Sequence, residues 1–156
     1  MISTSQIQVG TAAEHLVIAD LLLDGHQAFL TTAGAAYDVV VDIGGQLSTI
    51  QVKATRRVSE WRKKAKTKAY LFTVRQMRRG RKPSADIYAF VALDTRTIAY
   101  LRRDEILSRD GVSAVKVIEF RTSEAAAASR RTLFPSGKVR QYDVRIITDY
   151  PLSRIL

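Results

Sequence analysis

An acid, an amide and an amine occupy two strand-like segments of this chain in positions where they can meet. The segments flank Gly44 and Gly45, and a Gly-Gly pair between two such segments predicts a tight β-hairpin. With the glycines as the two loop residues, Asp38 lies directly opposite Gln51. Lys53 shares their face because side chains alternate along a strand. A carboxylate, an amide and an ammonium gathered in this way can bind a cation and a phosphate.

The helix that precedes the hairpin must position any further group. The spacing of apolar residues predicts a helix over residues 5–24, capped by Thr4 or Ser5 and ended by Gly25. Its buried stripe is predicted at Ala13, Leu16, Val17 and Leu21.

Glu14 interrupts the apolar part of this helix, one turn after Gly10. A glycine inside a helix costs about 1 kcal/mol relative to alanine, which predicts that Gly10 admits a close neighbour. Glu14 is either a solvated helix residue or a fourth member of the polar group on the hairpin.

The remaining pattern predicts an α/β fold in one domain, with a mixed sheet of about four or five strands and helices on its faces. Further strands are predicted at residues 28–30, 70–74, 86–93, 98–101, 115–120 and 142–147, and helices at 103–107 and 123–131. Asp86, at the start of the most apolar strand, either neutralises a nearby base or assists the polar group. We expect residues 108–156 to form C-terminal additions to this core, for contacts either with a second copy or with a nucleic acid.

Composition limits the class of protein. The chain has 156 residues, 46% of them hydrophobic and 26% charged, as in a soluble globular domain. No apolar run reaches the length of a membrane span, and no signal peptide is evident, so we expect a cytoplasmic protein without a membrane partner. The absence of cysteine excludes disulfides, thiolate metal sites and a cysteine nucleophile.

The excess positive charge is confined to one segment. Residues 53–82 contain 13 basic residues and one acid, whereas the rest of the chain has 12 bases and 14 acids. Such a block predicts contacts with the phosphates of a nucleic acid. The candidate residues for these contacts are Arg56, Arg57, Trp61, Arg62, Lys63, Lys64, Lys66, Lys68, Arg78, Arg79, Arg81 and Lys82. Trp61 either stacks on a base or sugar, or anchors its own loop to the protein body.

Together these features resemble the PD-(D/E)XK nuclease superfamily. The motifs that carry the resemblance are Gly10-x-x-x-Glu14, Tyr37-Asp38 and Gln51-Val52-Lys53. The resemblance covers roughly residues 7–107. It implies a restriction-endonuclease-like core and an endonuclease that cuts double-stranded DNA and leaves a 5′-phosphate. It also implies a dependence on Mg²⁺, for which Mn²⁺ can substitute, and a homo-oligomer, either dimer or tetramer, for cutting both strands.

One position departs from the superfamily pattern. Gln51 stands where a Glu or Asp usually lies, two residues before the lysine. A Gln-x-Lys variant is similar to that of homing endonucleases encoded by group I introns. The short start to the Glu14 helix also resembles archaeal Holliday-junction resolvases, but these usually keep an acid at this position. The substitution therefore favours the homing-endonuclease branch and argues against a second tightly held metal.

The four polar residues can be given roles in phosphodiester hydrolysis. Asp38 is the expected bridging ligand of Mg²⁺, and Glu14 a second ligand, direct or through water. Gln51 binds the metal or positions a water through its carbonyl oxygen, or holds Lys53 or a phosphate through its amide. Lys53 orients the attacking water or stabilises the pentacoordinate phosphate, and a role as general base would require a much lowered pKa.

The sequence is also compatible with three alternatives to a homing endonuclease. The four polar residues could form a structural salt-bridge cluster at a sheet edge. The protein could be a junction resolvase or another structure-specific nuclease. It could also be a non-catalytic nucleic-acid-binding module with a decayed nuclease site.

Overall fold

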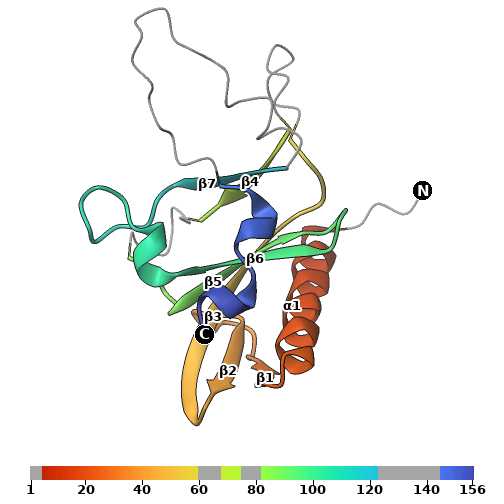
Figure 1. Cartoon of the computed structure of the whole chain (residues 1–156), viewed down its shortest axis with the longest axis vertical. Coiled ribbons are helices and arrows are strands. Elements are labelled where there is room, and N and C mark those ends of the chain that lie inside the picture. The colour runs from red at the N-terminus through yellow and green to blue at the C-terminus, as the bar shows by residue number, and fades with distance from the viewer. Residues whose placement is uncertain (1–4, 60–67, 75–81, 123–144) are drawn as a thin grey trace, which may run out of the picture.

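The computed structural model describes residues 5–59, 68–74, 82–122 and 145–156 (Figure 1). Its α-helix is α1 (Gln6–Leu23), and three 3-10 turns are η1 (Arg103–Ile106), η2 (Ile147–Asp149) and η3 (Leu152–Arg154). The strands are β1 (Gln27–Leu30), β2 (Val39–Ile43), β3 (Gln46–Thr55), β4 (Ala69–Thr73), β5 (Ile87–Ala92), β6 (Thr97–Arg102) and β7 (Val117–Arg121). None of the described helices is long and apolar enough to cross a membrane.

Both ends of α1 are built by the residues that the sequence indicated. The Ser5 hydroxyl accepts a hydrogen bond from the Gln8 N–H, and the Gln8 side chain accepts one from the Ser5 N–H, which is a capping box. At the other end, the N–H groups of Gly25 and His26 donate to carbonyls of the last turn, with Gly25 at a φ of 90°. This Schellman motif needs the positive φ that glycine adopts freely.

The environment of Gly10 differs from the prediction. A Cβ placed on Gly10 would meet no atom within 4 Å among the described residues, so this part of the protein contains no close neighbour for the glycine to admit. The position of a glycine within a helix does not predict how much space lies beside it, because that space depends on segments distant in the sequence.

The β2–β3 hairpin has the predicted register. Val39 pairs with Ile50 and Ile43 pairs with Gln46, so that Gly44 and Gly45 form the two-residue loop. Their φ values of 62° and 87° are those of a type I′ turn, which matches the twist of the flanking strands.

The sheet confirms the mixed α/β architecture. Five strands lie in the order β1-β2-β3-β5-β6, and β4 and β7 form a separate two-stranded sheet. Strand β3 is parallel to β5, whereas the other neighbouring strands are antiparallel. In Figure 1 the β2–β3 hairpin projects from the bottom of the view and the β4–β7 pair lies towards the top.

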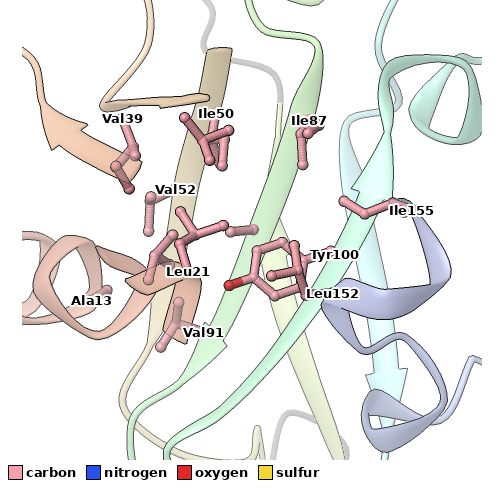
Figure 2. Close-up of a cluster of buried hydrophobic side chains, with 14 residues drawn as sticks. Ala13, Leu21, Val39, Ile50, Val52, Ile87, Val91, Tyr100, Leu152 and Ile155 are labelled. Atoms are coloured by element: carbon pink, nitrogen blue, oxygen red, sulfur yellow. The ribbon is translucent and has the colours of Figure 1, made fainter. Parts of the chain in front are cut away.

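One face of the five-stranded sheet packs against α1 (Figure 2). The buried side chains labelled there are Ala13, Leu21, Val39, Ile50, Val52, Ile87, Val91, Tyr100, Leu152 and Ile155. The Tyr100 hydroxyl donates a 2.7 Å hydrogen bond to Asp20 and so ties α1 to β6. Burial raises the pKa of this phenol well above its ordinary value, and the bond to Asp20 adds to the effect.

The opposite face is covered differently from the expectation of helices on both faces. Tyr70 and Phe72 of β4, with Ile118 and Phe120 of β7, pack against Phe90 and other residues of β5 and β6. Among the described residues α1 is the one α-helix, so a strand pair fills the place of a second helix layer. The predicted helix at 123–131 lies outside the described residues. Part of the strand predicted at 142–147 also lies outside the described residues. Of its described part, Ile146 forms a parallel β-bridge with Arg121, and η2 begins at Ile147.

Asp86 links the two parallel strands. Its Oδ2 oxygen accepts hydrogen bonds from the Thr49 N–H at 3.0 Å and the Thr49 hydroxyl at 2.7 Å, and its own N–H donates to the Thr49 carbonyl. These bonds lower the pKa of the Asp86 carboxyl below its ordinary value, and the charge of Arg103 contributes less. Asp86 therefore has a structural role at the start of β5.

Replacing Gly10 with alanine should raise the free energy of unfolding by about 0.5–1 kcal/mol, because alanine has less freedom to lose in a helix and fits without contact. Gly25→Ala is the matched comparison. It should destabilise by about 1 kcal/mol because its φ is left-handed. Urea unfolding of both variants checks this pair, and a loss of stability in Gly10→Ala would mean that something does pack there.

Asp86 should contribute to stability in a pH-dependent way. Because its pKa is lowered in the folded state, its contribution is present above the unfolded-state pKa and is lost as pH falls through the folded-state value. Asp86→Asn should therefore be less stable than the wild type near neutral pH, and the difference should shrink in acid. Unfolding free energies measured across this range test the effect, and a pH-independent difference would contradict it.

Candidate functional site

Asp38 lies at the entrance to β2, where two donors hold one of its oxygens. The Asp38 N–H donates to the Ile50 carbonyl at 2.9 Å, which fixes the backbone opposite Gln51. The Oδ2 oxygen accepts a 2.7 Å hydrogen bond from the Val52 N–H and a second from Nε2 of Gln51. The carboxylate and the amide are therefore in direct contact, as the hairpin register predicted.

Lys53 follows on the same face of β3. Parallel pairing sets Gln51 beside Tyr88 and Lys53 beside Phe90, and both aromatic residues are buried. Gln51 and Lys53 are themselves half-buried. The site thus lies along the margin of the aromatic core between β5 and the β4–β7 pair, which limits the access of water to one side of it.

Glu14 of α1 is half-buried, and its carboxyl group interacts electrostatically with that of Asp38. Burial raises the pKa of the Glu14 carboxyl above its ordinary value, and the negative charge of Asp38 raises it further, while His15 acts in the opposite direction. The helix and the hairpin therefore bring two carboxylates into electrostatic interaction.

The donor set fits a magnesium ion. Mg²⁺ is usually bound through one or two carboxylates, with water and substrate phosphates completing its shell. Among the described residues no hydrogen bond reaches Oδ1 of Asp38, so this oxygen can bind a cation. Within the same residues no group of three or more His, Cys, Asp or Glu side chains could hold a metal. Asp38, Glu14 and Gln51 stay the predicted ligands, and a cation there would take the rest of its shell from water and phosphate.

The structure adds a residue that the sequence did not indicate. The Ser84 hydroxyl lies 3.4 Å from Oε1 of Gln51 and can donate to it. Ser84 precedes the apolar β5 strand by three positions and belongs to no motif. Only the parallel pairing of β3 with β5 brings it to the site.

The described candidate DNA-binding residues are exposed. Arg56 and Arg57 directly follow β3, so they continue the strand that carries Gln51 and Lys53. Lys68 directly follows residues 60–67 and Lys82 directly follows residues 75–81, and neither of these two segments is described. The candidates Trp61, Arg62, Lys63, Lys64, Lys66, Arg78, Arg79 and Arg81 lie outside the described residues.

Replacing Asp38 with asparagine should lower the pKa of Glu14, because the like charge is removed while the burial of Glu14 remains. The pKa should stay above the ordinary value of a glutamate. Carboxyl ¹³C chemical shifts of Glu14 across a pH titration measure this, with Asp149→Asn, an exposed acid of η2, as the control. An unchanged pKa in Asp38→Asn would mean that the two carboxylates are too far apart to share a cation.

No protein-family model matches this chain, and no curated protein matches it. A solved structure of a bacterial homing endonuclease, I-Ssp6803I, is similar, with a TM-score of 0.59. The match covers 76% of this chain and 76% of that chain, at 19% sequence identity. This chain therefore shares its fold with the bacterial homing endonuclease.

Proposed function

We propose that this protein is a magnesium-dependent DNA endonuclease of the homing type, which hydrolyses phosphodiester bonds. The observation that carries the proposal is the contact between Asp38 and Gln51, with Lys53 on the same face and Glu14 within electrostatic reach. The shared fold with a homing endonuclease supports it. The Gln-x-Lys spacing, which resembles that of the intron-encoded enzymes, favours this branch over junction resolvases.

The residues of the site divide the chemistry between them. Asp38 and Glu14 bind Mg²⁺, with Mn²⁺ as a substitute. When bound, the ion stabilises negative charge on the phosphate and lowers the pKa of a coordinated water. Lys53 donates hydrogen bonds to a phosphate oxygen or to the attacking water, and its ammonium adds positive charge. The product keeps the phosphate on its 5′ end.

Binding and chemistry are assigned to different parts of the chain. The basic segment of residues 53–82, with a local charge of +12, contacts the DNA phosphates and releases their counterions. Each site cuts one strand, so cutting a duplex requires two copies, and we propose a homo-oligomer, either a dimer or a tetramer. Each copy then places its own Asp38 near one scissile phosphate.

Asp38→Asn and Lys53→Met should each lower the cleavage rate on the order of 1,000-fold while binding to DNA remains, because each removes charge that acts in the transition state. Asp149→Asn and Lys116→Met make the same changes at exposed positions away from the site and should cut normally. Rates are measured on linear duplex pools with Mg²⁺, and binding by fluorescence anisotropy with Ca²⁺.

The outcomes separate the competing functions. A strong preference for a four-way junction over linear duplex at equal salt would indicate a junction resolvase. Salt-dependent DNA binding by the wild type without cleavage in Mg²⁺ or Mn²⁺ would indicate a binding module with a decayed site. Cleavage retained by Asp38→Asn or by Lys53→Met would contradict the assignment of the site itself.

A further inference from the structure

The Gln51 carboxamide lies between two different partners. Its Nε2 group donates to Oδ2 of Asp38, and its Oε1 oxygen lies 3.4 Å from the Ser84 hydroxyl. The two ends of an amide are not interchangeable here, since a reversed amide would set its oxygen against a carboxylate. Asp38 therefore fixes one orientation, in which the nitrogen faces the acid, and the Ser84 hydroxyl can donate to the oxygen at the other end.

The turn that carries Ser84 is held from both sides. The Ser84 N–H donates to the Tyr88 hydroxyl at 2.9 Å. Arg103 donates from Nε to the Ala85 carbonyl at 3.1 Å and from Nη2 to the Pro83 carbonyl at 3.2 Å. Tyr88 is only 2% exposed, so its hydroxyl is a fixed acceptor. These three hydrogen bonds fix the position of Ser84 relative to β3.

The two carboxylate oxygens of Asp38 differ in their hydrogen bonds to the described residues. Oδ2 already accepts from the Val52 N–H and from Gln51, while Oδ1 accepts from no described residue. A carboxylate held through one oxygen cannot rotate freely, so Oδ1 keeps one direction. Asp38 then meets a cation with one prearranged oxygen.

We propose that Ser84 is a positioning residue of this site, which holds the Gln51 amide so that Asp38 offers Oδ1 alone to the cation. This inference rests on the proposed function, because the cation is the one that the nuclease would use. It gives Gln51 the task of orienting Asp38 in place of binding the metal. A group that orients a metal ligand typically changes metal affinity by about tenfold or more when it is removed.

Calcium binding by the full-length protein tests the proposal without requiring cleavage. Ser84→Ala should weaken Ca²⁺ affinity by about tenfold in calorimetry, and Ser84→Thr, which keeps a hydroxyl, should restore most of it. Ser153→Ala, an exposed serine of η3, is the matched control and should bind like the wild type. In a Gln51→Ala background, Ser84→Ala should cause no further loss, because the group through which it acts is gone.

The Gln51 amide gives a second readout in the metal-free protein. Its side-chain NH₂ resonances, identified by their loss in Gln51→Ala, should exchange slowly with water in the wild type and in Ser84→Thr. They should exchange faster in Ser84→Ala. Thermal unfolding of each variant establishes that the fold is retained.

Two results would overturn the proposal. One is a Ser84→Ala protein with unchanged Ca²⁺ affinity and unchanged Gln51 exchange. The other is an equal loss of affinity in the wild-type and Gln51→Ala backgrounds, since Ser84 would then act by another route. If the wild type neither binds Ca²⁺ nor cleaves DNA, the proposed function fails, whereas the amide exchange still tests whether Ser84 holds Gln51.

Discussion

The register of the β2–β3 hairpin is the constraint on which the site depends. A slip of one residue would turn Gln51 and Lys53 to the α1 face and turn Ile50 and Val52 to the opposite face. The register is set twice, by the two glycines that form the loop and by the apolar residues that must face α1. The same pairing that buries the core therefore brings Asp38 into contact with Gln51.

The two faces of the sheet serve different purposes. On one face α1 covers the sheet and supplies Glu14 beside the hairpin. On the other face the β4–β7 pair buries an aromatic cluster that includes Tyr88 and Phe90, the neighbours of Gln51 and Lys53 across the strand pairing. The polar residues thus pack against a buried aromatic cluster. This packing limits their motion and reduces the screening of their charges by water.

Charge is distributed along the chain in a way that suits the proposed nuclease function. The acids of the site and the bases of residues 53–82 meet at β3, which carries Lys53 near its end and leads directly into Arg56 and Arg57. In the proposed function, a DNA backbone bound by Arg56 and Arg57 would lie close to the strand that carries the site. Mutual repulsion between DNA and the two acids is what a bound cation would relieve.

The sequence by itself determined the elements and registers that depend on near neighbours: the capped helix, the Gly44-Gly45 hairpin and the opposition of Asp38 to Gln51. These follow from local chemistry and strand alternation, which act over a few residues. Only the tertiary structure decided that the space beside Gly10 is open, that strands cover the second face, and that Ser84 lies beside Gln51 in a turn to which Arg103 donates hydrogen bonds. Each of these depends on chain segments far apart in sequence, above all on the parallel pairing of β3 with β5, and no local pattern encodes such contacts.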